Sequence, residues 1–142
     1  MSQIIRDITE ISRCGAQYRT EALAPMGLKA CHASYLTEIC ANPGISQERL
    51  ARMIYINKSN VTRSLSYLET HGFVTREQSS EDRRITLVYP TEKAHDILPT
   101  VRAIVRGWNA YITEGFTEEE LEHEAKALDY SMQLIQASGQ EN

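Results

Sequence analysis

The order of short segments between residues 45 and 93 restricts the possible folds more than any other feature of this chain. Two helical patterns come first, followed by a glycine, an extended segment, a polar tip and an alternating strand. The first helix is expected to begin at Ser46, whose hydroxyl can accept a hydrogen bond from the opening turn. Its apolar positions, Leu50, Ala51 and Ile54, then face the core.

The second helix has a start signal, an apolar stripe and a stop signal of its own. Asn57 can cap its N-terminus, and Gly72 can end it. Val61, Leu65 and Leu68 recur at positions i, i+4 and i+7, which places them on one side of a helix. The segment is therefore expected to pack this stripe inward and to leave its other side accessible.

The accessible side of the second helix lacks carboxylates, because Glu69 follows only near its C-terminal end. Asparagine can pair with adenine and arginine with guanine, while hydroxyls and lysine suit base edges or phosphates. This composition favours contact with DNA, although an ordinary solvated helix face is the alternative. The residues concerned are Lys58, Ser59, Asn60, Thr62, Arg63, Ser66 and Tyr67.

A hairpin is expected after the second helix, with strands over residues 73–77 and 84–89. Ile85, Leu87 and Tyr89 alternate toward one face of the second strand. The tip carries Arg83 and Arg84, which can enter a minor groove or grip phosphates, although a solvated turn is the alternative. Two helices followed by such a hairpin indicate a winged helix-turn-helix in a mainly α (α+β) protein that binds duplex DNA.

Four pieces of this region resemble the MarR family of bacterial transcriptional regulators. They are Asn-Lys-Ser-Asn-Val-Thr-Arg-Ser-Leu at 57–65, Leu-Glu-x-x-Gly-Phe-Val at 68–74, Asp-x-Arg at 82–84, and Leu-Val-x-Pro-Thr-Glu-Lys at 87–93. The resemblance implies that the second helix enters the major groove. It also implies that Asp82 orients Arg84 toward the minor groove, while Arg83 occupies the variable position of the motif and is a candidate phosphate contact.

The net charge of −4 is unevenly distributed along the chain. Residues 94–142 hold 9 of the 19 acidic side chains and only 3 of the 15 basic ones, whereas residues 46–93 carry 8 basic and 6 acidic side chains. The field near the reading helix can therefore be positive in an acidic protein, and weak non-specific DNA binding is expected at physiological salt.

The flanking segments predict long amphipathic helices over about residues 1–24 and 91–138, around a DNA-binding region over about 28–93, in a single domain of residues 1–142. Pro25 and Gly27 end the first helix before the next one begins at Leu28, and Pro99 bends a longer helix without ending it. Thr117 and Glu120 form a capping-box pattern that opens the last helix.

These terminal helices present more apolar surface than one small winged domain can cover, which predicts a homodimer. MarR-like proteins dimerise through the same helices, so the resemblance implies the same assembly. Two copies would place two reading helices in successive major grooves of a pseudo-palindromic operator. A closed monomeric helical bundle is the alternative.

The resemblance also implies response to a small aromatic effector, which loosens DNA binding of many MarR-like repressors. Candidate residues for such a crevice are Tyr18, His32, Tyr35 and Trp108. Ordinary core and interface packing is the alternative for all four.

The cysteines do not form a metal-binding pattern. Cys31 and Cys40 lie on opposite sides of one expected helix, so they cannot hold one ion together, and no metal or cofactor is expected. Hydroperoxide sensors of the MarR family use a reactive cysteine early in the first helix, but Cys14 lies too close to the next helix to match it. A thiol-based redox regulator of the same fold stays an alternative.

Other functional classes have weaker support. The sequence shows no phosphate loop or catalytic motif, so no enzyme is expected. A winged-helix adaptor for a protein partner would need exposed apolar residues on the reading face, where only Tyr67 fits. No signal peptide or membrane span is recognisable, and a cytoplasmic protein is expected.

Overall fold

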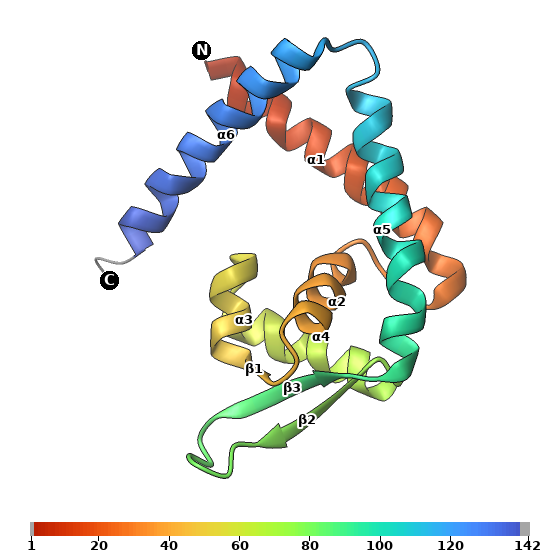
Figure 1. Cartoon of the computed structure of the whole chain (residues 1–142), viewed down its shortest axis with the longest axis vertical. Helices are drawn as coiled ribbons and strands as arrows, with labels where there is room; N and C mark the ends of the chain where they lie inside the picture. Colours follow the sequence, from red (N-terminus) through yellow and green to blue (C-terminus); the bar gives the residue numbers. More distant parts are fainter. Residues whose placement is uncertain (1, 140–142) are drawn as a thin grey trace. The chain divides into compact units, whose positions relative to one another are not determined.

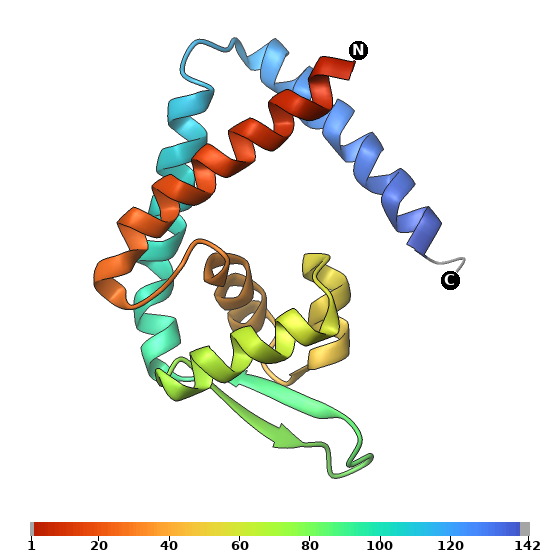
Figure 2. The same cartoon turned by 180° about the vertical axis from the view of Figure 1, so that it is seen from behind.

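The computed structural model describes residues 2–139, which form several helices and one small antiparallel sheet (Figures 1 and 2). The strand order in the sheet is β1-β3-β2. In chain order the elements are α1 (Ser2–Leu23), η1 (Ala24–Met26), α2 (His32–Ala41), β1 (Ile45–Ser46), α3 (Gln47–Ile54), α4 (Lys58–Thr70), β2 (Val74–Gln78), β3 (Thr86–Pro90), α5 (Glu92–Ile112) and α6 (Glu118–Gly139).

The chain divides within α5, between Trp108 and Asn109, into two compact units. The first unit contains the elements from α1 through most of α5, including the sheet, and the β2–β3 hairpin projects from its helices (Figures 1 and 2). The second unit contains the end of α5 and all of α6. No helix in the part of the chain that the structure describes is long and apolar enough to cross a membrane.

Helices α2, α3 and α4 pack with the sheet around the core of the first unit. The stripe of Val61, Leu65 and Leu68 is buried as its spacing predicts, and each such side chain contributes about 1.5–3 kcal/mol through burial. The largest fully buried side chains are Tyr35, Phe73, Leu23, Leu36, Ile39, Leu50, Leu65 and Leu68.

Both expected N-caps of the helix-turn-helix are present. The hydroxyl of Ser46 accepts a hydrogen bond from the backbone N–H of Arg49 at 3.1 Å, and Asn57 Oδ1 accepts one from the backbone N–H of Asn60 at 2.9 Å. Gly72 follows α4 with a φ of +80°, a left-handed conformation that ends the helix without strain. These contacts fix the start and the end of α4.

The second strand of the hairpin buries the face opposite to the one that its alternating apolar residues predict. Val88 is fully buried, whereas Ile85 is exposed and Leu87 and Tyr89 are half-buried. The core therefore lies on the opposite face of β3 from the residues that alternate most clearly. A third strand, β1, was not expected: it pairs Ile45 with Val88 and gives β3 a partner on each side.

Helix α2 begins at His32, so the expectation of a start at Leu28 is wrong. The reason is that Leu28 completes the turn after α1 instead of opening α2. Gly27 adopts a φ of +73°, and the backbone N–H of Leu28 donates to the carbonyl of Leu23 at 3.3 Å while its side chain is buried. A buried residue after a left-handed glycine is typical of a helix end.

The later helices follow the sequence patterns closely. Helix α5 continues through Pro99, and α6 opens with the expected capping box. The hydroxyl of Thr117 accepts from the backbone N–H of Glu120, and the Glu120 carboxylate accepts from the backbone N–H of Thr117, both at 3.1 Å.

Candidate DNA interface

The N-terminal half of α4 and the tip of the hairpin form the candidate interface. A cleft of about 220 Å³ lies between them, so both are parts of one surface of the first unit. Lys58, Ser59, Asn60, Thr62, Arg63 and Ser66 are all exposed, as are Arg83 and Arg84 at the tip. The cleft is lined by Ser46, Gln47, Glu48, Lys58, Val61, Thr62, Arg84, Ile85 and Thr86.

The hydroxyls on α4 already make internal hydrogen bonds. Thr62 donates to the carbonyl of Lys58 at 3.0 Å, and Ser66 donates to the carbonyl of Thr62 at 2.9 Å. Ser59 donates to Asn57 Oδ1 at 2.9 Å. Because a hydroxyl has a single proton, these groups offer DNA only acceptor lone pairs unless the internal bonds break.

Asn60 and Arg63 are the least constrained side chains of the interface. Within residues 2–139, no hydrogen bond or ion pair involves either side chain. Their amide and guanidinium groups thus keep their full hydrogen-bonding capacity, including the bidentate geometry that distinguishes adenine and guanine.

A carboxylate from the neighbouring helix enters the interface. Glu48 on α3 approaches Lys58 at 3.7 Å, and both side chains are mostly exposed. An exposed pair of this kind contributes little to stability, but it places a negative charge beside a candidate phosphate contact. The sequence analysis considered only the face of α4 and therefore missed Glu48.

The tip of the hairpin holds Arg84 in a defined orientation. Asp82 Oδ1 accepts from the backbone N–H of Arg84 at 3.0 Å and from its Nε at 3.1 Å, and Oδ2 accepts from a terminal nitrogen at 3.1 Å. These hydrogen bonds hold the pKa of Asp82 below its usual value. The Arg84 side chain is 91% exposed, so its guanidinium remains available to a ligand.

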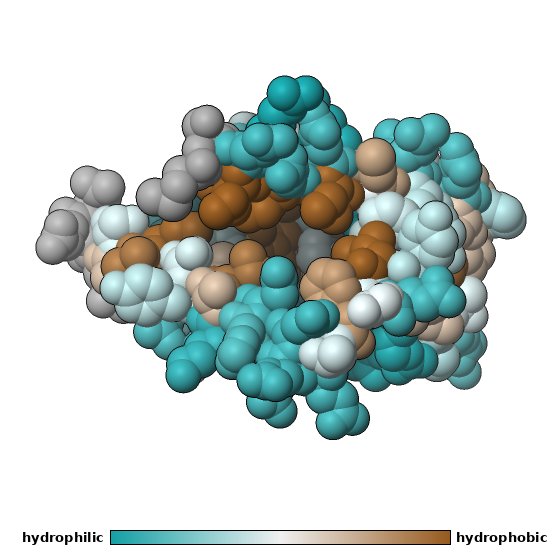
Figure 3. Space-filling view, turned by 90° about the horizontal axis from the view of Figure 1, so that it is seen from above, coloured by the Kyte–Doolittle hydropathy of each residue, from teal (hydrophilic) through white to brown (hydrophobic). Residues whose placement is uncertain are grey.

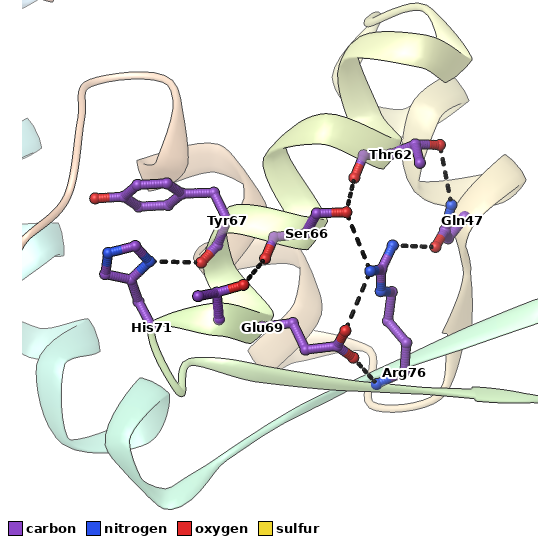
Figure 4. A network of polar contacts seen from close by, with 8 residues as sticks. Gln47, Thr62, Ser66, Tyr67, Glu69, His71 and Arg76 are labelled. Atoms are coloured by element: carbon purple, nitrogen blue, oxygen red, sulfur yellow. Dashed lines mark hydrogen bonds and ion pairs between the residues drawn. The ribbon is translucent and has the colours of Figure 1, made fainter.

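Arg76 on β2, which the sequence analysis did not single out, connects the hairpin to both helices of the motif (Figure 4). It contacts Glu69 and Ser66 on α4 and Gln47 at the start of α3. The hydrogen bond from Arg76 is the main cause that lowers the pKa of Glu69. The sequence signal for this contact is an acidic residue near the end of α4, Glu69, followed by a basic residue on the adjoining strand, Arg76.

Tyr67 does not belong to the accessible face, contrary to expectation. Its ring is half-buried and stacks between His32 and His71, with ring centroids 4.8 Å and 3.9 Å away. Its hydroxyl donates to the carbonyl of Gly27. The position lies at the edge of the face in a helical projection, and the turn before α2 covers it.

The four candidate effector residues divide into separate environments. Tyr18 on α1 and Trp108 on α5 face each other at a centroid distance of 5.4 Å. His32 instead stacks on Tyr67, and Tyr35 is fully buried in the core. Gly15 permits the close approach of Trp108, because a Cβ there would lie 2.7 Å from the indole nitrogen.

The three cysteines are free thiols. Cys14 and Cys31 are exposed, and Cys40 is half-buried. Burial raises the pKa of Cys40, which disfavours its thiolate. Among the described residues, no group of three or more histidine, cysteine or acidic side chains is placed to hold a metal ion.

Large apolar side chains remain exposed on the terminal helices, and Figure 3 shows apolar side chains, in brown, at the surface. In the first unit they are Ile4, Ile5, Ile8, Ile11 and Tyr18 of α1. In the second unit they are Tyr111, Ile112, Phe116, Leu121, Leu128, Tyr130, Met132, Leu134 and Ile135.

Comparisons with known proteins agree with this architecture. A sequence model of the MarR family matches residues 30–86. The chain is 31% identical over 122 residues to the uncharacterized HTH-type transcriptional regulator YybA of Bacillus subtilis (strain 168), covering 86% of this chain and 81% of the relative. The crystal structure of the transcriptional regulator SlyA has a TM-score of 0.90 at 26% identity and covers 95% of each chain. A MarR family regulator from Listeria monocytogenes, complexed with 26mer DNA, has a TM-score of 0.86 at 29% identity over 92% of this chain and 87% of its own.

Proposed function

Because the chain belongs to the MarR family of transcriptional regulators, which are not enzymes, we propose that it binds duplex DNA sequence-specifically as a homodimer. In this proposal α4 enters the major groove, and the β2–β3 hairpin, the wing, reaches the adjacent minor groove. The observation that carries it is the cleft that Lys58 and Thr62 of α4 share with Arg84, whose side chain Asp82 orients. The unengaged Asn60 and Arg63 lie on the same helix, next to Thr62 or two residues from it. The complex of the Listeria relative with 26mer DNA supports the same class of ligand.

The chemistry of each side chain suggests its role in this complex. Asn60 and Arg63 read base edges, and Arg84 inserts into the minor groove while Asp82 keeps it oriented. Lys58 and Arg83 contact phosphates. Ser59, Thr62 and Ser66 accept hydrogen bonds through the lone pairs that their internal bonds leave free.

The assembly we propose is a two-fold dimer formed by the helices over residues 1–24 and 91–138, with residues 28–93 as the DNA-binding region. The exposed apolar side chains of these helices support it, since an unpaired protomer would leave them in water. A two-fold dimer places two copies of α4 on a pseudo-palindromic operator. The protein then acts as a repressor in the cytoplasm, where it meets the chromosome.

A small aromatic effector is part of the proposal as the regulatory input. The adjacent rings of Tyr18 and Trp108, tilted by 32° with centroids 5.4 Å apart, support it, since aromatic ligands bind well against such rings. Trp108 is the single tryptophan of the chain, so quenching of its fluorescence would report binding directly. An effector that releases the operator without affecting this fluorescence would place the site elsewhere.

Selection of bound duplexes from a random pool tests the proposed function. We expect the recovered sequences to converge on two inverted half-sites whose centres lie about one helical turn apart, since symmetry reports the dimer and base preference reports α4. Convergence on a single asymmetric half-site would contradict the dimer. Recovery of no preferred sequence would contradict specific binding.

Arg63→Ala is expected to relax base preference as well as affinity. If Arg63 pairs bidentately with guanine, its loss costs about 1–3 kcal/mol on the selected operator and much less on a duplex with that guanine replaced. The measurement is a fluorescence-anisotropy titration with both duplexes at fixed salt. Arg52→Ala is a matched control, because this exposed arginine lies on α3 outside the proposed contacts. Equal loss on both duplexes would reassign Arg63 to a phosphate contact.

The alternative function, a winged-helix adaptor that binds a protein partner, loses the one residue that favoured it in the sequence. Tyr67 was the one residue of the reading face that suited a protein partner, and it packs between two histidines instead. A thiol-based sensor likewise gains no specific observation from the three free cysteines.

A further inference from the structure

Arg76 makes an unusually complete set of contacts for a residue of a surface hairpin. One terminal nitrogen donates to Gln47 Oε1 at 3.3 Å, and the other donates to Ser66 Oγ and to Glu69 Oε1, both at 3.1 Å. Its backbone N–H donates to Glu69 Oε2 at 3.1 Å. The side chain is 19% exposed. Both oxygens of Glu69 are thereby engaged, which fixes the carboxylate in one orientation.

These contacts join three elements at one point (Figure 4). Arg76 belongs to β2, the strand that leads into the wing tip, while Ser66 and Glu69 belong to α4 and Gln47 opens α3. The network continues from Ser66 to the carbonyl of Thr62, and Gln47 Nε2 donates to the hydroxyl of Thr62 at 3.4 Å. It therefore ends at Thr62, which is next to the unengaged Arg63 and two residues from the unengaged Asn60.

We propose that Arg76 is a positioning residue for DNA recognition, which sets the separation between α4 and the wing through Glu69, Ser66 and Gln47. This inference rests on the proposed function, because it assumes that α4 and Arg84 contact DNA together. Adjacent grooves of a duplex have a fixed spacing, so both contacts form at once only when the wing stands at the matching distance from α4.

A direct phosphate contact by Arg76 fits the structure less well. Both terminal nitrogens already donate to protein oxygens, and a carboxylate neutralises the guanidinium. Arg84 presents the opposite case, since its side chain is 91% exposed. In this proposal the two arginines have different roles. Arg84 contacts DNA, and Arg76 positions the hairpin on which Arg84 lies.

Glu69→Gln gives the sharpest test, because it removes a negative charge from a DNA-binding unit. Simple electrostatics would strengthen binding, whereas the positioning role predicts about a tenfold loss of affinity for the selected operator, as expected for losing a hydrogen bond to a charged group. Affinity for an unrelated duplex should stay unchanged. Glu77→Gln is the matched control: this exposed residue lies next to Arg76 on β2 and its substitution changes the charge equally.

Arg76→Met should have the same effect as Glu69→Gln, and the double variant should be no worse than either single one, because both break one network. The dependence of affinity on salt should change equally in Arg76→Met and Glu69→Gln, since both displace Arg83 and Arg84 together with the wing. Arg84→Ala should cost less in the Glu69→Gln background than in the wild type, because a displaced wing has already lost that contact. Thermal unfolding checks each fold, and Arg76→Lys replaces Arg76→Met if the latter is unfolded at the assay temperature.

Three results would overturn the inference. Wild-type operator affinity in Glu69→Gln would show that the network does not position the wing. A salt slope reduced by about one more in Arg76→Met than in Glu69→Gln would make Arg76 a phosphate contact. Equal losses on the operator and the unrelated duplex would indicate general damage to the fold. Failure of the proposed function looks different, since Arg84→Ala in the otherwise wild-type chain would then leave operator affinity unchanged.

Discussion

Leu128→Lys is expected to convert the proposed dimer into monomers and to lower operator affinity by about 10²–10⁴-fold, the advantage that linking two binding units commonly provides. Leu128 lies on the α6 stripe with Leu121, Met132 and Ile135, and it is 52% exposed. None of the described residues of α6 is buried within the chain. A lysine in the middle of this stripe would have to bury its charge in an apolar interface, which costs far more than the lost packing alone.

Sedimentation equilibrium at micromolar concentration and an operator titration measure the two effects of Leu128→Lys. Gln133→Lys is the matched control, because it adds the same charge about 140° around α6 from Leu128. This control should remain a dimer with wild-type affinity. A wild-type chain that sediments as a monomer would favour the closed helical bundle and remove the basis of the dimer. Weakened DNA binding by a Leu128→Lys dimer would show instead that α6 affects the DNA-binding region in another way.

Features encoded by neighbouring residues could be predicted from the sequence. The caps at Ser46, Asn57 and Thr117 depend on a side chain and a backbone amide three residues later, so the residue types and their spacing suffice. The Asp82–Arg84 contact spans two residues, and the family resemblance supplied it. The stripe of α4 required only helical periodicity.

Features that join distant segments were missed for a common reason. Strand β1 exists because Ile45 meets Val88, and its two residues carry too little pattern to be recognised alone. Tyr67 is covered by the turn before α2, which lies about 40 residues earlier in the chain. Arg76 meets Gln47 and Glu69 only after the hairpin has folded onto the helices. In each case, tertiary packing decided a position that local spacing left open.

His32 is the second site at which a large effect is expected, because it is a buried histidine held in its neutral form. It is 3% exposed, its Nδ1 accepts from the backbone N–H of Lys29 at 3.0 Å, and its ring stacks on Tyr67. Burial is the main cause that lowers its pKa from 6.5 to about 4, with smaller contributions from the charges of Lys29 and His71. A protonated ring would lose the acceptor that Lys29 requires.

The free energy of unfolding should therefore fall as the pH drops from about 6.5 toward 4. In this range the unfolded chain binds a proton at His32 that the folded chain does not, so acid favours unfolding. The slope is about 1.4 kcal/mol per pH unit, which amounts to about 3 kcal/mol over the whole range. Above pH 6.5 His32 is neutral in both states and contributes no pH dependence. The pKa values of Glu69 and Asp82 are also lowered, from 4.5 and 3.8, so the stability that these carboxylates contribute is lost mainly as the pH falls below these values.

Urea unfolding between pH 5 and 7.5, at one protein concentration, measures this dependence in the wild type and in His32→Asn. Asparagine can keep an acceptor for the Lys29 amide but cannot titrate, so the variant should be less stable at pH 7.5, through lost ring packing, and should lose most of the slope. His95→Asn is the matched control, because His95 is exposed on α5, and it should retain the wild-type slope. An unchanged slope in His32→Asn would mean that another group takes up the proton on unfolding. The neutral ring between Lys29 and Tyr67 would then stabilise the turn before α2 without making it sensitive to acid.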